Sequence, residues 1–125
     1  MNGPADALVT IEIDLADLRG GEMITREAGG REILVCRTRD GVFAVDGQCS
    51  HAEARLCEGR LRGTRVICPL HGAAFDVRSG AVLRGPARQP IRAYPVRCDG
   101  ARAWVTVPVV DTPDTSMAGQ RRVID

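Results

Sequence analysis

The stretch that decides the fold reads Cys49-Ser50-His51 and, after sixteen further residues, Cys68-Pro69-Leu70-His71. Each half offers one cysteine and one histidine, spaced C-x-H in the first and C-x-x-H in the second, and the 125 residues contain no other histidine. A single cysteine usually acts as a small buried hydrophobic residue, but this structural role does not explain two cysteine–histidine pairs at short spacing. Thiolate and imidazole groups are metal ligands. The sequence therefore predicts that the two cysteines and two histidines hold one metal centre.

Two kinds of metal centre use mixed cysteine and histidine ligands. Structural zinc sites usually follow C-x₂₋₄-C and H-x₃₋₅-H spacing, whereas this chain alternates the two residue types. Alternation suits a [2Fe–2S] cluster of the Rieske type, in which two cysteines bind one iron and two histidines bind the other. The predicted ligands are Cys49 and Cys68 on one iron and His51 and His71 on the other. A zinc-binding structural module on the same four residues is the alternative.

The residues around these pairs resemble a Rieske iron–sulfur domain. Phe75-Asp76 and Gly80 follow the second pair, residues 43–48 match the strand before the first, and residues 85–96 are similar to the proline-containing loop and strand of that family. The resemblance covers roughly residues 6–108 and is strongest to the small ferredoxins that serve ring-hydroxylating dioxygenases. It implies an all-β fold, in which an antiparallel sandwich or barrel base carries a small inserted cluster-binding lobe.

Four positions distinguish this chain from the respiratory Rieske proteins it also resembles. Those proteins join an extra cysteine in each ligand loop as a disulfide, but the matching residues here are Ala54 and Leu70. They also place hydroxyl groups near the cluster sulfurs, where this chain has Ala73 and Phe75. Hydrogen bonds to sulfur stabilise the reduced cluster. Their loss predicts a reduction potential near the low end of the Rieske range, about −150 mV.

The chain outside the ligand stretch predicts short strands joined by glycine-rich turns. Alternating or apolar runs predict strands at residues 7–14, 22–27, 32–38, 42–46, 65–67, 74–76, 81–83, 91–96 and 103–107. One helical turn is expected at residues 15–18 and a turn at residues 58–63. This pattern is typical of an all-β domain. We expect a Rieske domain over residues 1–110, its cluster lobe at about 47–76, and a flexible tail over residues 111–125.

Composition narrows the class of protein. A net charge of +1 and 3% aromatic residues do not favour nucleic-acid binding. No apolar run approaches the length of a membrane span or signal peptide, so a soluble cytoplasmic protein is expected. Cys36, Cys57 and Cys98 remain after the ligands, and we expect them as free thiols. Tyr94 and Trp104 are expected to pack against the core or its rim and not to relay electrons.

The resemblance implies a one-electron carrier and not an enzyme. With both histidines assigned to the cluster, none remains for a mononuclear iron site, and no G-x-G-x-x-G motif for a nucleotide cofactor is present. By resemblance, an NAD(P)H-dependent flavin reductase supplies the electrons and a Rieske non-haem iron ring-hydroxylating dioxygenase receives them. Both partners are expected to bind transiently at the end of the domain that carries the four ligands. The carrier itself is expected to be a monomer. The small subunit of a nitrite reductase is the second hypothesis.

Overall fold

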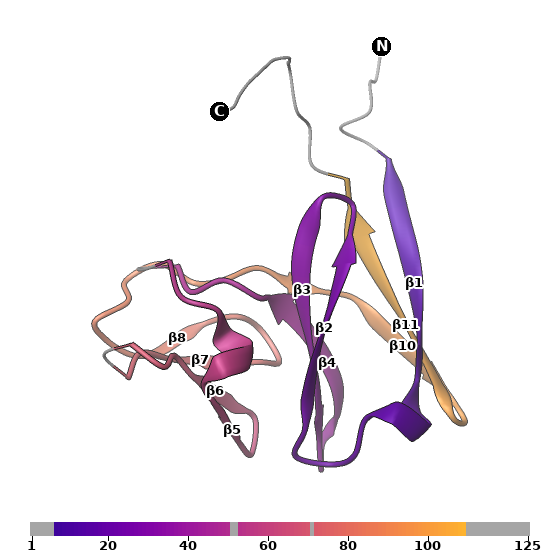
Figure 1. The fold of residues 1–125 in the computed structure, drawn as a ribbon, viewed down its shortest axis with the longest axis horizontal. Helices are drawn as coiled ribbons and strands as arrows, with labels where there is room; N and C mark the ends of the chain where they lie inside the picture. Colours follow the sequence, from indigo (N-terminus) through magenta and orange to yellow (C-terminus); the bar gives the residue numbers. More distant parts are fainter. Residues whose placement is uncertain (1–6, 51–52, 71, 110–125) are drawn as a thin grey trace.

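The computed structural model describes residues 7–50, 53–70 and 72–109, which form three antiparallel sheets (Figure 1). The first sheet has the order β1-β11-β10, with β1 (Leu8–Asp14), β11 (Arg102–Pro108) and β10 (Val96–Asp99). The second has the order β2-β3-β4-β9, with β2 (Met23–Ala28), β3 (Arg31–Thr38), β4 (Gly41–Asp46) and β9 (Ala93–Tyr94). The third has the order β5-β6-β7-β8, with β5 (Arg60–Arg62), β6 (Arg65–Ile67), β7 (Ala74–Asp76) and β8 (Val82–Arg84). Two single turns of 3₁₀ helix, η2 (Leu15–Asp17) and η3 (Leu56–Glu58), complete the described elements.

The second sheet is the central layer, and strand β3 shows why. Ile33 and Val35 point into a core shared with the first sheet, while Leu34 and Cys36 point into a core shared with the third. All four side chains are fully buried. Successive residues of a strand face opposite sides, so a strand covered on both faces needs an unbroken apolar run. That requirement explains Ile33-Leu34-Val35-Cys36.

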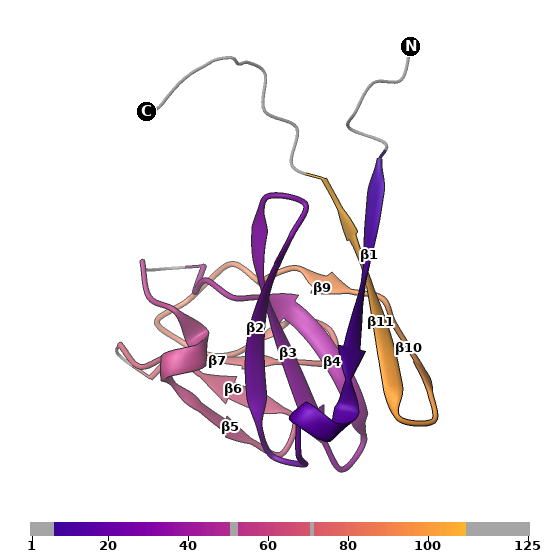
Figure 2. The same cartoon turned by 45° about the vertical axis from the view of Figure 1, so that its right-hand side comes forward.

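The two cores divide the protein into a base and a lobe, which lie side by side in Figures 1 and 2. The base consists of the first and second sheets, and the lobe consists of the third sheet with η3 and the adjoining loops. The base core contains Ile13, Leu18, Tyr94, Val105 and Val107 among others. The lobe core is built around Phe75, whose side chain is fully buried against residues such as Leu56 and Val66. The predicted all-β fold of base and inserted lobe is confirmed.

Two local predictions were wrong, and each has a physical reason. The predicted turn at residues 58–63 is instead η3 followed by strand β5, with Gly63 and Thr64 turning the chain into β6. The three residues Arg60–Arg62 carry only one apolar side chain, Leu61, too few to signal a strand from sequence. The predicted strand at residues 91–96 is divided at Pro95 into β9 and β10, which belong to different sheets. Proline has no N–H for a ladder hydrogen bond.

The described lobe sheet reaches Arg84, beyond the expected lobe boundary near residue 76. The predicted tail at residues 111–125 lies outside the described residues. Within residues 7–50, 53–70 and 72–109, no helix is long and apolar enough to span a bilayer.

Candidate metal centre

Two loops at one end of the lobe carry the predicted ligands, and both are closed in the same way. The backbone N–H of Cys49 donates to the carbonyl of Ala54 at 2.9 Å, and that of Cys68 donates to the carbonyl of Ala73 at 2.7 Å. Each loop therefore contains six residues and begins with its cysteine. The residues that flank each loop form an antiparallel β pair, Gln48 with Arg55 at the first loop and Ile67 with Ala74 at the second. Although the C-x-H and C-x-x-H spacings differ, the two loops are equivalent in length and closure.

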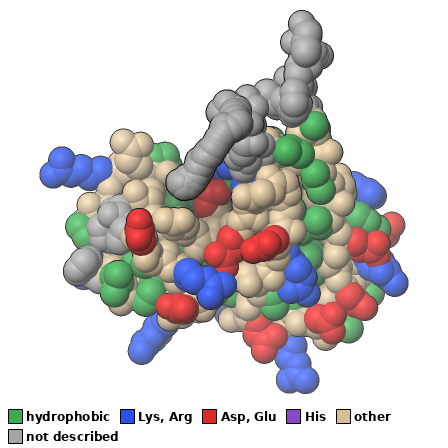
Figure 3. All heavy atoms as spheres, turned by 45° about the horizontal axis from the view of Figure 1, so that its top comes forward, with side chains coloured by type: hydrophobic (Ala, Val, Ile, Leu, Met, Phe, Trp, Pro, Cys, Tyr) green, Lys and Arg blue, Asp and Glu red, His purple; other side chains and the backbone are tan. Residues whose placement is uncertain are grey.

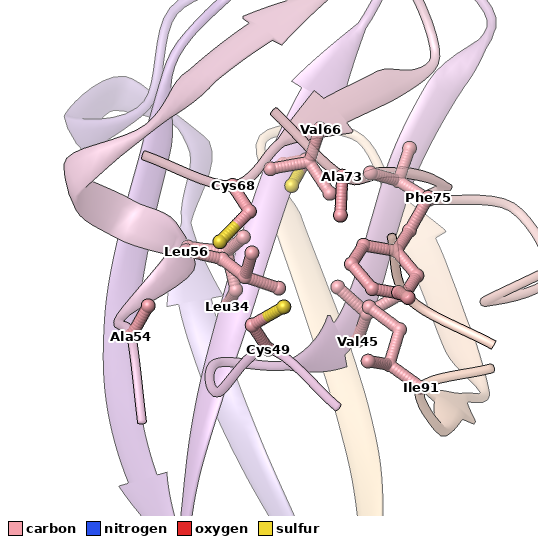
Figure 4. Packing of buried hydrophobic residues seen from close by; sticks show 13 residues of the cluster. Leu34, Val45, Cys49, Ala54, Leu56, Val66, Cys68, Ala73, Phe75 and Ile91 are labelled. Carbon is pink, nitrogen blue, oxygen red and sulfur yellow. The ribbon is translucent and has the colours of Figure 1, made fainter. Parts of the chain in front are cut away.

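The two cysteine side chains meet between the loops. Cys49 is 3% exposed and Cys68 is 2% exposed, and Figure 4 shows their side chains close to one another within the lobe core. Burial raises the pKa of the Cys68 thiol, the hydrogen bond from the Leu70 backbone N–H opposes this, and hydrogen bonding with the Cys49 thiol adds to the rise. Two buried sulfurs that interact with one another, one of them already receiving a backbone N–H, could form the sulfur half of a metal site.

The predicted histidine ligands, His51 and His71, lie outside the described residues. Among the residues that are described, no group of three or more histidine, cysteine, aspartate or glutamate side chains comes together as a metal site. The structure thus brings together Cys49 and Cys68. The assignment of His51 and His71 stays a prediction.

A third loop, residues 85–90, is tied to the first ligand loop. The hydroxyl of Ser50 donates to the carbonyl of Gln89 at 2.5 Å. Ala87, in the middle of this loop, is 4% exposed and packs into the lobe core. At the end of the loop the N–H of Ile91 donates to the carbonyl of Gly80 at 2.9 Å, which attaches it to the β7–β8 turn. The third loop therefore packs beside the cysteine end of the lobe core.

The positions that distinguish this chain from respiratory Rieske proteins surround the thiols. Ala54 and Ala73 are buried and supply the carbonyls that close the two loops, while Leu70 is 47% exposed at the tip of the second loop. Phe75 is wholly buried beneath Ala73 and carries no hydroxyl (Figure 4). None of these four side chains can form a disulfide or donate a hydrogen bond to sulfur.

The remaining cysteines are free thiols, as predicted. Cys36 is buried in strand β3, Cys57 is partly buried in η3, and Cys98 is exposed in β10. Burial raises the pKa of the Cys36 thiol to about 12, so this thiol stays protonated and unreactive at neutral pH.

Two polar contacts that position the first ligand loop were not identified from the sequence. Asp46, just before that loop, accepts hydrogen bonds from the Tyr94 hydroxyl and from the Arg92 N–H, the latter at 3.0 Å. Arg55, just after the loop, donates to Glu32 of β3, with Nη2 and Oε2 2.5 Å apart. Both contacts join residues far apart in sequence, and no short-range pattern signals them. Tyr94 was expected to pack in the core, which it does, with its hydroxyl anchored on Asp46.

The fold is an all-β domain with an inserted lobe, and two matched loops of the lobe each present a buried cysteine. These features are typical of small iron–sulfur proteins. Residues 10–95 match the Rieske [2Fe-2S] domain family. The chain belongs to this family, whose cofactor is one [2Fe–2S] cluster. The described residues fit that group, because two buried sulfurs lie close to one another and the Leu70 N–H already points at one of them.

Named relatives place the chain among ferredoxins. It is 36% identical over 100 residues to the ferredoxin component of the naphthalene 1,2-dioxygenase system of Pseudomonas aeruginosa, covering 80% of this chain and 91% of the relative. The ferredoxin of carbazole 1,9a-dioxygenase from Nocardioides aromaticivorans IC177 superposes with a TM-score of 0.72 at 39% identity, covering 77% of this chain and 93% of that one. A putative NADH-dependent nitrite reductase small subunit from Mycobacterium tuberculosis shares the fold, with a TM-score of 0.72 at 24% identity, covering 84% of this chain and 100% of that one.

Proposed function

We propose that this protein is a one-electron carrier of an aromatic-ring-hydroxylating dioxygenase system. The observation that carries the proposal is the pair of matched loops, which bring the buried thiols of Cys49 and Cys68 together at the lobe tip. The two relatives named above at 36% and 39% identity are ferredoxins of dioxygenase systems. We assign Cys49 and Cys68 as ligands of one iron, and His51 and His71 as ligands of the other.

The bound [2Fe–2S] cluster would supply the one-electron redox chemistry, and the chain's own residues would tune and shield it. Leu70 donates its backbone N–H to the Cys68 sulfur, which favours the negative thiolate. Burial of both cysteines excludes water from their sulfurs. The absence of hydroxyl donors at Ala73 and Phe75 keeps the potential low within the Rieske range, so that the carrier in its reduced form is a good electron donor.

The partners follow from this role. We propose that an NAD(P)H-dependent flavin reductase supplies electrons and that a Rieske non-haem iron oxygenase receives them, each through transient contacts at the lobe tip. Exposed Leu70 provides an apolar contact there, and small interfaces suit redox encounters. Cys36, Cys57 and Cys98, which lie outside the ligand loops, form no disulfide with one another. Because structural disulfides are typical of oxidising compartments, this supports our proposal of a cytoplasmic location. We propose a monomer, which sedimentation of the purified protein tests.

Electron paramagnetic resonance of the dithionite-reduced protein, with iron and zinc assayed on the same sample, tests the cofactor and the ligand set. The expected result is two irons per chain and a rhombic signal whose average g value lies below that of an all-cysteine cluster. Cys68→Ser and His71→Gln should each abolish the signal, while Cys98→Ser, at an exposed cysteine outside the loops, should keep it. A colourless, EPR-silent protein with one zinc per chain would refute the carrier and leave the structural zinc module.

The nitrite reductase alternative differs from the carrier in whether the chain is stable and redox-active without a second subunit. A carrier folds and titrates reversibly as a purified chain, whereas an enzyme subunit would need its large subunit to be stable or redox-active. A reversible redox titration of the isolated protein therefore favours the carrier.

A further inference from the structure

The lobe is positively charged, although the whole chain is almost neutral. Residues 49–90 contain seven arginines and three acidic residues, a net charge of +4, while the rest of the chain contains ten arginines and thirteen acidic residues. Figure 3 shows acidic and basic side chains interspersed over the base. The excess of positive charge is therefore confined to the lobe, the part of the molecule that carries the candidate metal centre.

The register of the lobe sheet gathers four of these arginines on one face. Leu61, Val66, Phe75 and Val82 are paired across the sheet and point into the lobe core. Arg60, Arg62 and Arg65 are strand neighbours of Leu61 and Val66 and point outward, because side chains alternate along a strand. Arg84 is two residues from Val82, but the register shifts at a bulge between Ala74 and Phe75, so that Arg84 lies opposite Ala74, the outward neighbour of Phe75. The outward and exposed arginines, called the arginine face below, are Arg60, Arg62, Arg65 and Arg84.

The arginine face is not neutralised within the described residues. Arg62 lies directly opposite Arg65 across strands β5 and β6, and like charges in that position destabilise a sheet. The only acidic residue in the four lobe strands is Asp76, opposite Arg65. Its carboxylate oxygens accept from the Arg78 side chain at 3.0 and 2.9 Å. Among the described residues, no carboxylate comes within ion-pair distance of any member of the arginine face.

The arginine face begins beside the second ligand loop. That loop connects Ile67 to Ala74, and the residues paired with these two are Arg60 on β5 and Arg84 on β8. The loop thus leaves the sheet between two arginines. Arg62 and Arg65 form the next row, two residues further along the strands, or about 7 Å away. A partner that approaches the loop meets this positive field at the same time.

We propose that the arginine face is a docking surface for an acidic protein partner, which exchanges electrons at the adjoining second ligand loop. The inference rests on the proposed function in one respect, that the partner is a redox protein. Guanidinium groups form paired hydrogen bonds with carboxylates, so acidic side chains of a partner would relieve the repulsion between Arg62 and Arg65. Opposite charges mainly accelerate association, and salt weakens the effect.

Stopped-flow electron transfer to two acceptors of opposite charge tests the proposal. The reduced protein is mixed with plastocyanin, which has an acidic surface, or with cytochrome c, which has a basic one. At an ionic strength of about 10 mM, Arg62→Gln/Arg65→Gln should slow the reduction of plastocyanin about tenfold, and the difference should disappear near 0.5 M salt. The same variant should leave the reduction of cytochrome c equal or faster. This reversal separates docking from a change in driving force, which would affect both acceptors alike.

The matched control is Arg19→Gln/Arg39→Gln, which removes the same charge from exposed arginines of the base. It should change the plastocyanin rate by less than about twofold. An effect as large as that of the lobe variant, or no effect of the lobe variant, overturns the proposal. If a 20-base-pair DNA duplex binds through the arginine face while the plastocyanin rate is unchanged, the face belongs to nucleic acid and the proposal is again overturned.

Failure of the carrier function gives a different result. In that case the wild-type protein reduces neither acceptor, although its cluster signal is intact. Binding of reduced plastocyanin, measured by calorimetry at the same low salt, then still tests the arginine face. Loss of binding in the lobe variant alone supports it, and equal binding by all three proteins refutes it.

Discussion

Gly59→Ala should destabilise the lobe, because a methyl group at this position has no space. A Cβ built on Gly59 would lie 1.8 Å from the carbonyl oxygen of Ile67 and 3.0 Å from its carbon. Carbon and oxygen atoms in contact keep about 3.3 Å apart, so the two backbones must separate by more than an ångström. Gly59 has a φ of −90°, so left-handed backbone strain is not the cause. Overpacking of this kind costs about 3 kcal/mol, which lowers the melting temperature by roughly 12 to 20 °C.

The same clash should disturb the metal centre. Ile67 immediately precedes Cys68, and its displacement moves the start of the second ligand loop. We expect Gly59→Ala to contain less iron per chain after purification than the wild type, in addition to melting earlier.

Two other glycines serve as controls that separate the effect of the steric clash from that of backbone conformation. Gly63 has a φ of +62° and nothing within 4 Å of its Cβ position, so Gly63→Ala should cost only about 1 kcal/mol for the left-handed backbone. Gly20 has neither feature, and Gly20→Ala should change stability by less than about 1 kcal/mol. Melting followed by far-ultraviolet circular dichroism at one heating rate gives the order. If Gly59→Ala melts with Gly63→Ala, or retains full iron, the close approach between Gly59 and Ile67 is refuted.

Three further predictions concern single groups. Burial and the hydrogen bond to Asp46 raise the pKa of Tyr94 to about 12. Because Tyr94 is the only tyrosine, the absorbance at 295 nm should titrate near that pH, and Asp46→Asn should lower the midpoint of this titration. The folding stability that the protonated Tyr94 hydroxyl contributes should be lost as pH rises from about 10 to 12. Exposed Cys98 should react rapidly with a thiol reagent and buried Cys36 only after unfolding, so loss of the fast phase in any variant other than Cys98→Ser would contradict the assignment. Redox titration should give about −150 mV, and Ala73→Ser should raise this potential because its hydroxyl can donate to sulfur; an unchanged or lower potential in that variant would contradict the prediction.

The parts of the fold that the sequence predicted are those with a local signature. Strand β3 was predicted from an unbroken apolar run, β1 from alternation, and the β2–β3 hairpin from Gly29-Gly30. Pro95 did not reveal from sequence alone that it divides a strand between two sheets. Strand β5 was missed because its stability comes from pairing with β6 and from burial of Leu61, not from its own residues.

The candidate metal centre divides in the same way. The alternation of cysteine and histidine predicted the cluster, which the match to the Rieske family bears out, because ligand chemistry depends on residue type and spacing. The histidine ligands stay a prediction. The equal closure of the two loops was invisible, since the two motifs differ in length by one residue. The contacts of Asp46 with Tyr94 and of Arg55 with Glu32 each join segments more than twenty residues apart, and only the packing of lobe against base brings them together.

The sequence by itself determined the family, the cofactor and the all-β class, because each depends on short motifs and on side-chain periodicity that are read along the chain. The tertiary structure decided which groups become neighbours in space. It placed the Cys49 and Cys68 side chains close to one another, and it collected four arginines, dispersed between residues 60 and 84, on one surface. Strand register produces that surface, and register is set by which side chains fill the core.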